Sequence, residues 1–234
     1  MTKNTITEQE IATLKSSGMF VEKGKTHFSV RFLVVGGHLT SEQLSTIAKF
    51  AKKYGDGFVH LTTRQGIEIP HVPYQKLPLL QRAVDKAGLK FAPSGPCVRA
   101  VVACPGTWCK FGLIDTQTIA TEIFKRFGKR KGLPHKFKIS VGGCRHCCAK
   151  PQENDLGVMG VPGGYAVFVG GMAGKTPRWA DQLPFVVKDK KVLWKLLKAI
   201  IDWFEQHGNP KERFGATIER IGLQRLLDDI GTPS

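Results

Sequence analysis

Apolar and polar positions along residues 1–90 follow two different periods, which predict two kinds of element. Runs of apolar and β-branched residues predict strands, whereas apolar residues spaced three and four apart predict amphipathic helices. Ser41 is expected to cap one helix, because a serine hydroxyl can accept a hydrogen bond from a free backbone N–H. The order of elements predicts a small α/β half-domain. Strands are predicted at 27–35, 58–63 and 67–69, and helices at 8–15, 41–55 and 77–87.

From residue 91 onward, buried-type strands alternate with helices, and the chain ends in a helical segment. Pro93, Gly95 and Pro96 interrupt the pattern, since proline and glycine mark turns and linkers. The sequence therefore predicts a domain of residues 1–90 and a domain of residues 91–234. In the second domain, strands are predicted at 98–103, 137–141, 156–161 and 165–169, and helices at 115–127, 192–207 and 211–230.

The composition excludes a disordered or fibrous protein, because 41% of the 234 residues are hydrophobic and can bury a sizeable core. Lys and Arg number 35 against 19 Asp and Glu, which gives a net charge of +16 and favours anionic partners. No apolar run approaches the ~20 residues of a membrane span, and residues 1–8 lack the apolar core of a signal peptide. A cytoplasmic protein without a membrane partner is expected.

All six cysteines lie between residues 97 and 148. In a reducing compartment such a cluster more often holds metal than forms disulfides. Cys104 and Cys109 have four residues between them, Cys144 and Cys148 have three, and each pair follows a predicted strand. Four converging thiolates suit tetrahedral zinc or a cubane iron–sulfur cluster. Zinc sites favour two-residue spacers, which only Cys144 and Cys147 have. The spacing therefore favours iron–sulfur, with zinc and spare thiols as alternatives.

The two cysteine segments, ACPGTWC and GGCRHCCAKP, resemble the sirohaem- and 4Fe–4S-binding signature of the sulfite/nitrite reductase family. The second cysteine pair has the spacer of that family, whereas the first pair has four intervening residues where the family usually has five. The resemblance implies a sirohaem and a 4Fe–4S cluster, with Cys148 bridging the cluster and the haem iron. Cys147 is an additional thiol, and Cys97 is expected to be a buried strand residue. The implied cluster ligands are Cys104, Cys109, Cys144 and Cys148.

Several basic residues lie in segments that resemble anion-binding motifs of the same family. Arg64 and Gln65 lie in TTRQ, Arg99 lies in PCVRA, and Lys136 and Lys138 lie in LPHKFK. Arginine can bind the sirohaem carboxylates or an oxyanion substrate bidentately, while lysine supplies point charge and protons. Lys136 and Lys138 alternate in a predicted strand, so both side chains are expected on one side. The resemblance implies that Arg64, Arg99, Lys136 and Lys138 are catalytic, and that the same four with Gln65 and Cys148 bind the cofactor.

The resemblance implies an α/β (α+β) fold, with a ferredoxin-like half-domain followed by a sirohaem- and 4Fe–4S-binding α/β domain. It also implies a small, single-half sulfite reductase that reduces sulfite to sulfide, with nitrite to ammonia as the alternative. No nicotinamide- or flavin-binding fingerprint is visible, so electrons are expected from an acidic ferredoxin-type donor. Full-length relatives build each site from two such halves, whereas this chain carries each set of motifs once. A homo-oligomer is therefore expected, with the basic residues of one subunit facing the cysteines of another.

Plainer interpretations of these residues stay open. Arg64 suits an ordinary surface turn, and Lys136 and Lys138 suit a solvated strand face. The basic run at 128–132 is typical of a solvated turn, although it could also dock an acidic donor. For the whole chain, one alternative is a basic zinc-binding nucleic-acid module, although no basic motif interleaved with aromatic residues is present. The other is a cluster-only electron-transfer protein. The favoured interpretation includes no nucleic-acid partner.

Overall fold

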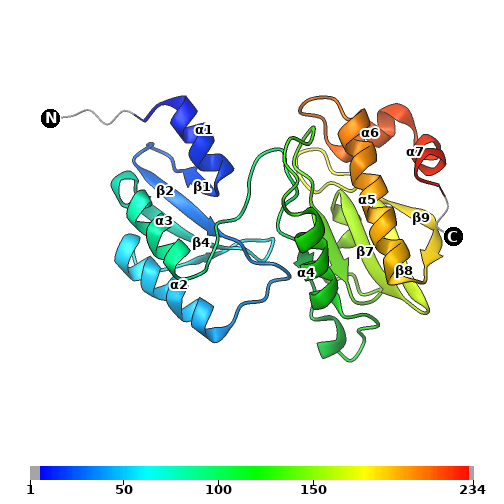
Figure 1. The fold of residues 1–234 in the computed structure, drawn as a ribbon, viewed down its shortest axis with the longest axis horizontal. Coiled ribbons are helices and arrows are strands. Elements are labelled where there is room, and N and C mark those ends of the chain that lie inside the picture. Colours follow the sequence, from blue (N-terminus) through cyan, green and yellow to red (C-terminus); the bar gives the residue numbers. More distant parts are fainter. Residues whose placement is uncertain (1–5, 232–234) are drawn as a thin grey trace. The chain divides into compact units, whose positions relative to one another are not determined.

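The computed structural model describes residues 6–231, and the chain folds as two compact units, Met1–Gly95 and Pro96–Ser234 (Figure 1). Each unit contains its own sheet. Among the helices of residues 6–231, none combines the length and the apolar character needed to cross a membrane.

The first unit is built on a four-stranded antiparallel sheet with strand order β1-β2-β4-β3. Side chains from the sheet and from two helices form its core, in which Phe28, Ile47 and Leu80 are fully buried. The elements of this unit are α1 (Glu8–Ser16), β1 (Met19–Val21), β2 (His27–Phe32), α2 (Ser41–Tyr54), β3 (His60–Leu61), β4 (Ile67–Pro73) and α3 (Leu77–Lys86).

The start of α2 corrects one prediction, because Thr40 and not Ser41 is its N-cap. The Thr40 hydroxyl accepts from the Gln43 N–H at 3.2 Å, and the Gln43 side chain accepts from the Thr40 N–H at 3.0 Å. This reciprocal capping box satisfies two backbone donors that a lone Ser41 cap would leave to water. β2 ends at Phe32 rather than at residue 35, because Leu33 donates its N–H to Lys90 outside the sheet.

The second unit contains a five-stranded sheet with strand order β5-β6-β7-β8-β9. β5, β6 and β7 are parallel to one another, whereas β7, β8 and β9 are antiparallel. In Figure 1, α4 and α5 lie side by side in front of this sheet, and Lys190 and Glu122 form an ion pair of 2.8 Å between them. The elements are β5 (Val102–Ala103), α4 (Thr116–Phe127), β6 (Ile139–Gly142), β7 (Leu156–Val161), β8 (Gly164–Val169), β9 (Asp181–Val187), α5 (Lys190–His207), α6 (Phe214–Ile221) and α7 (Leu223–Ile230).

Several strand and helix boundaries in this unit differ from the predictions. The predicted strand at 98–103 is regular only as β5, and Val98 makes an isolated bridge to Phe137. β9 has no counterpart among the predictions; it is an edge strand, a position that tolerates the proline at position 184. The predicted helix at 211–230 is two helices, because Gly222 has a φ of +102° that interrupts the helical hydrogen bonds.

Candidate metal and anion site

Four cysteines follow the carboxyl ends of β5 and β6. Cys104 comes directly after β5, and Cys144 comes two residues after the end of β6. Because the two strands are parallel neighbours, both ends lie at the same edge of the sheet, where open α/β sheets bind ligands. Cys104, Cys109, Cys144 and Cys148 line one apolar cavity of about 250 Å³ there, together with Phe111 and His146.

Backbone and side-chain hydrogen bonds hold the two cysteine loops against each other. The Gly143 N–H donates to the Cys104 sulfur at 3.0 Å, and the Leu113 N–H donates to the Gly143 carbonyl at 2.8 Å. The Thr116 hydroxyl and the Gln117 amide both donate to the Cys104 carbonyl. The loop after β5 is therefore fastened both to the start of α4 and to the loop after β6.

Glycines make this close approach of the two loops possible. Gly106 has a φ of +62°, and a Cβ there would lie 2.4 Å from the Thr116 hydroxyl. A Cβ on Gly112 would lie 1.9 Å from the Gly106 carbonyl oxygen. A Cβ on Gly143 would lie 3.1 Å from the Gly106 Cα. The walls of the cavity therefore depend on positions where only glycine fits.

The four cavity cysteines supply a donor set for either metal centre that the spacing allows. A cubane iron–sulfur cluster takes one thiolate at each of its four irons. A structural zinc ion takes four ligands at one point. Cys104, Cys109, Cys144 and Cys148 are therefore the residues that could hold a metal centre in this cavity.

Cys147 and Cys97 lie apart from the four cavity cysteines. The Cys147 sulfur accepts from the Gln152 amide at 3.1 Å, lies 3.7 Å from the Met159 sulfur, and packs beside a buried apolar group on β7 and β8. Cys97 is buried, and burial raises the pKa of its thiol while Arg99 and Lys131 oppose that rise. Neither residue lines the cavity.

His146 lies at the cavity beside Cys144. Its Nδ1 is 3.5 Å from the Cys144 sulfur, and its ring stacks on Phe111 with the centroids 4.7 Å apart. A side chain that stacks and contacts a cysteine sulfur in this way shields one side of the cavity.

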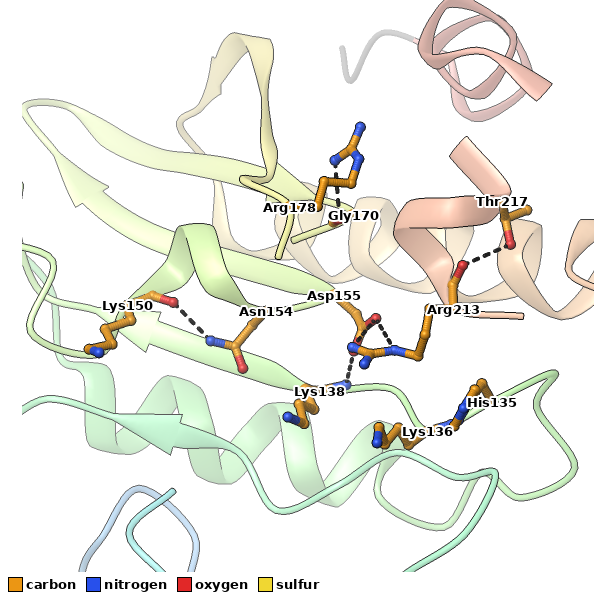
Figure 2. Close-up of polar contacts among 10 residues, drawn as sticks. All are labelled: His135, Lys136, Lys138, Lys150, Asn154, Asp155, Gly170, Arg178, Arg213 and Thr217. Carbon is orange, nitrogen blue, oxygen red and sulfur yellow. Dashed lines mark hydrogen bonds and ion pairs between the residues drawn. The ribbon is translucent and has the colours of Figure 1, made fainter. Parts of the chain in front are cut away.

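The structure brings Arg99, Lys136 and Lys138 together on two adjacent extended segments. The Arg99 N–H donates to the Phe137 carbonyl at 2.9 Å, which places Arg99 beside the residue between the two lysines. Phe137 is fully buried while both lysines are partly exposed, so the lysines share the face opposite Phe137. Both lysine side chains extend in the same direction in Figure 2. The segment precedes β6, which begins at Ile139, so the predicted strand at 137–141 starts two residues too early.

The pKa of His135 is affected by the positive charges around this segment. Burial is the main cause that lowers its pKa, and the charges of Lys136, Arg213 and Arg99 lower it further. Its Nδ1 accepts the Lys136 N–H at 2.7 Å, so the neutral ring carries its proton on Nε2. The cationic groups near His135 form a site that favours an anion.

The basic segment and the cysteine loops lie at opposite ends of β6. Lys138 immediately precedes the strand and Cys144 follows it. The four residues of β6 lie between them, a span of ~13 Å at about 3.3 Å per residue. The structure therefore assembles the cysteines at one end of the strand and the lysines with Arg99 at the other, rather than around one centre.

Arg64 and Gln65 lie in the first unit, in the tight turn between β3 and β4. The Thr62 N–H donates to the Gly66 carbonyl at 2.8 Å, and the Thr62 hydroxyl accepts the Gly66 N–H at 2.9 Å. Gln65 has a φ of +59°, and its side chain lies against Gly37, where a Cβ would come within 2.9 Å. Arg64 is thus held partly buried on a rigid turn.

Sequence reasoning missed Arg213 as a part of this site, and it placed Asp155 only in a segment that resembles the cofactor-side loops of the family, with no role beside the lysines. Asp155 is fully buried, and its carboxylate accepts the Lys138 N–H at 2.8 Å and two Arg213 Nη2 contacts of 2.9 Å (Figure 2). A single acidic residue at the start of an apolar strand was a usable signal for Asp155, because such a carboxylate needs a partner. Nothing near Arg213 in the sequence pointed to it.

Comparison with known families covers both units. A model described as the nitrite and sulphite reductase 4Fe-4S domain matches residues 94–234. A model described as the nitrite/sulfite reductase ferredoxin-like half domain matches residues 21–87. The predicted fold class, a ferredoxin-like half-domain followed by an α/β domain of this family, is confirmed.

The curated relatives and solved structures include both kinds of reductase. A nitrite reductase (NAD(P)H) of Bacillus subtilis is 32% identical over 88% of this chain and 25% of its own length. A coenzyme F420-dependent sulfite reductase of Methanocaldococcus jannaschii is 35% identical over 54% of this chain and 20% of its own length. The Mycobacterium tuberculosis NirA structure superposes with a TM-score of 0.85 at 20% identity, covering 97% of this chain and 47% of that one. A dissimilatory sulfite reductase I structure gives 0.81 at 17% identity, over 90% and 70% respectively. The chain thus spans a quarter or less of the length of these two curated relatives.

Proposed function

Because the chain belongs to the nitrite and sulphite reductase family, we propose that it is a sirohaem-dependent reductase of a small oxyanion. The proposed reaction reduces sulfite to sulfide, with nitrite to ammonia as the alternative substrate. The observation that carries the proposal is the single cavity that Cys104, Cys109, Cys144 and Cys148 share. Its volume and apolar wall suit a cluster, and its position at the carboxyl ends of parallel strands suits a bound cofactor.

The four cavity cysteines would hold the 4Fe–4S cluster, and Cys148 would also contact the sirohaem iron. The hydrogen bond from the Gly143 N–H to the Cys104 sulfur holds that sulfur in place at the cavity. Phe111 and His146 contribute to the apolar wall beside the cysteines. The sirohaem, when bound, would supply the iron at which the oxyanion is reduced, in the way that cofactors supply redox chemistry that side chains lack.

Arg64, Gln65, Arg99, Lys136 and Lys138 would bind the sirohaem carboxylates and the oxyanion. The guanidinium of an arginine can hold two oxygens at once, which orients the anion. The lysine ammonium groups can stabilise charge that develops on oxygen, and each carries a proton that the reduction consumes. The partly buried setting of Arg99, Lys136 and Lys138 strengthens these interactions relative to water.

We also propose that a working site combines two copies of this chain, so that the protein is a homo-oligomer. The support is β6, whose four residues span ~13 Å between Lys138 and the loop of Cys144 in one copy. A lysine side chain reaches only about half of that distance. Lysines from a second copy, related by the symmetry that most oligomers have, could face the cluster cysteines of the first.

A visible absorption spectrum of anaerobically purified protein, with iron and acid-labile sulfide counted on the same sample, tests the proposed cofactors. We expect sirohaem bands and about five irons per chain, four from the cluster and one from the haem. Steady-state rates with sulfite and with nitrite then identify the substrate. A colourless protein that contains zinc would overturn the proposal and favour a basic zinc-binding module.

Matched variants connect the spectrum to the cavity. We expect Cys148→Ser to remove the cluster and Cys97→Ser to keep it, because only Cys148 lines the cavity. For the anion, we expect Lys136→Gln to slow reduction, whereas Lys129→Gln, a change at an exposed turn residue of the same charge, leaves the rate within about twofold. Equal loss in both members of either pair would contradict the assignment.

A further inference from the structure

Asp155 is the only acidic residue that is buried among residues 6–231, and its side chain has no exposure to solvent. It lies immediately before β7. An unpaired carboxylate in such a place is costly, because burial removes its hydration. Burial raises the pKa of the Asp155 carboxyl, while the Arg213 guanidinium and the Lys138 N–H favour its ionised form.

The Asp155 carboxylate is the acceptor in its hydrogen bonds with Arg213 and Lys138. Oδ1 accepts from Arg213 Nε at 3.2 Å and Nη2 at 2.9 Å, and Oδ2 accepts from Arg213 Nη2 at 2.9 Å and the Lys138 N–H at 2.8 Å. Both oxygens therefore act as acceptors, as they do in an ionised carboxylate. Arg213 is itself largely buried, with a side-chain exposure of 13%.

The backbone of Asp155 and its neighbour add two further connections. The Asp155 carbonyl accepts the Gly170 N–H at 2.8 Å, and the Leu156 N–H donates to the Lys138 carbonyl at 3.0 Å. Lys138 is thus fixed on both of its backbone polar groups, by the Asp155 side chain and by the first residue of β7. Figure 2 shows Asp155 between the Lys138 segment and Arg213 at the start of α6.

The hydrogen bonds of Asp155 act on the same chain segment that carries the lysines of the proposed anion site. Lys138 follows Phe137, whose carbonyl accepts the Arg99 N–H, so the same short segment sets the positions of Lys136, Lys138 and Arg99. The Asp155 charge also offsets that of Arg213, which leaves the positive charge of the lysines for an external anion. A loss of either member of the pair would leave a buried charge unpaired at the base of this segment.

We propose that Asp155 and Arg213 form a positioning pair that fixes the backbone of Lys138 and thereby aims Lys136 and Lys138 at the oxyanion. This inference rests on the proposed function for the identity of the anion. Neither residue of the pair touches the anion. Asp155 acts through the Lys138 backbone, and Arg213 acts through Asp155.

The test compares Asp155→Asn, Arg213→Met and Arg213→Lys in the holoprotein. The control is Arg220→Met, which breaks the ion pair of Arg220 with Glu212 near α6 but makes no contact with the lysine segment. We expect Arg213→Met to raise the KM for the oxyanion about tenfold, while iron content and the rate of cluster reduction by dithionite without substrate stay unchanged. Arg213→Lys should recover part of the loss, because it restores the charge but not the two-point geometry.

Hydrogen exchange at the Lys138 amide gives a readout that is independent of activity. We expect that amide to exchange about tenfold faster in Asp155→Asn and Arg213→Met, while amides in the centre of β7 exchange at the wild-type rate. If the chain proves not to reduce sulfite or nitrite, faster exchange confined to Lys138 still supports the positioning role. If the chain is an active reductase and the pair variants behave like Arg220→Met in both measurements, the inference is wrong.

Discussion

At the scale of single residues, the six cysteines occupy three environments despite their closeness in sequence. Four line the cavity, Cys147 packs against the apolar side chains of β7 and β8, and Cys97 is buried near the basic segment. The backbone of Cys147 has a φ of +55°, and its sulfur contacts Gln152 and Met159. The CxxC spacing of Cys144 and Cys147, the strongest zinc-like signal in the sequence, therefore does not bring both sulfurs to one cavity.

We predict that Cys147→Ser keeps the full complement of cluster iron and labile sulfide. A serine hydroxyl can still accept the Gln152 amide hydrogen bond, so the change costs about 1 kcal/mol of folding free energy or less. Cys144→Ser, in the same loop, should lose the cluster. Iron and sulfide counts on both variants check this, and equal loss in the two would show that Cys147 is a ligand.

Glu212, next to Arg213, makes the stability of the second unit depend on acid. Arg220, the Asn209 N–H and the Thr217 hydroxyl donate to its carboxylate, and the Arg220 hydrogen bond is the main cause that lowers its pKa from 4.5 to about 2. A folded-state pKa below the unfolded value stabilises the fold above the unfolded pKa. That stabilisation disappears as the pH falls from 4.5 towards about 2.

We predict that Glu212→Gln lowers the free energy of unfolding by about 1–2 kcal/mol at pH 7, after allowance for solvent screening of a partly exposed group. The difference between wild type and variant should shrink steadily as the pH falls from 4.5 towards about 2, because Glu212 is protonated in the unfolded chain before it is protonated in the folded one. Denaturant unfolding at a series of pH values measures this difference. A gap that stays constant down to pH 2 would mean that the Glu212 charge contributes nothing.

At the scale of elements, the cavity depends on how a short loop meets the start of a helix. The loop after β5 turns through Gly106 and is fastened to α4 by the Thr116 hydroxyl. Gly163, in the turn between β7 and β8, has a similar positive φ of +80°, but a Cβ added there would have no heavy atom within 4 Å. The two glycines share the backbone requirement and differ only in what surrounds them.

We predict that Gly106→Ala destabilises the second unit by about 3 kcal/mol or more and lowers cluster occupancy. The added methyl group meets Thr116 in addition to the left-handed backbone penalty. Gly163→Ala should lose only about 1–2 kcal/mol, the backbone penalty alone, with iron content unchanged. Thermal unfolding with iron analysis compares them. Equal effects would show that the contact with Thr116 is unimportant.

The sequence predicted elements well where a local signal sets their ends. Helices beginning near Glu8, Ser41 and Thr116 have capping residues, and α2 ends next to Gly55 as expected. The predictions located β5 and β6 but made both strands too long, because regular pairing depends on neighbours far away in the chain. The pairing of Asp155 with Arg213 joins residues 58 positions apart, and no local pattern encodes such a contact.

At the scale of the whole molecule, the net charge of +16 would attract the proposed acidic electron donor. Opposite charge speeds diffusional encounter, and salt screens it over about 8–10 Å at moderate ionic strength. The direction of the salt effect therefore reports the charge of the electron donor.

We predict that the rate of reduction by an acidic ferredoxin falls about tenfold or more as salt rises from about 0.02 M to about 0.5 M. Reduction by the methyl viologen radical, a cation, should not fall over the same range. Stopped-flow measurements with the two donors provide the comparison. A rate with ferredoxin that is indifferent to salt would contradict an electrostatically guided donor.

The proposed site, built from two copies of the chain, leads to a prediction for a mixture of two inactive variants. Cys148→Ser lacks a cluster ligand and Lys138→Ala lacks a basic residue, so each variant alone should be nearly inactive. If the sites combine two chains of a dimer, random mixing gives one intact site in half of the dimers, about a quarter of wild-type activity. Sedimentation confirms the assembly. Failure of a mixed, exchanged sample to regain activity would place each site within one chain.

The cysteine cavity lies between two loops that hydrogen bonds join to each other and to α4. The Gly143 N–H donates to the Cys104 sulfur, the Leu113 N–H donates to the Gly143 carbonyl, and the Thr116 hydroxyl donates to the Cys104 carbonyl. The two loops are therefore mechanically coupled, so that a displacement of one loop shifts the cysteines of the other. A substitution that leaves every cysteine in place, at Leu113 or Thr116, can thus alter the spacing of all four.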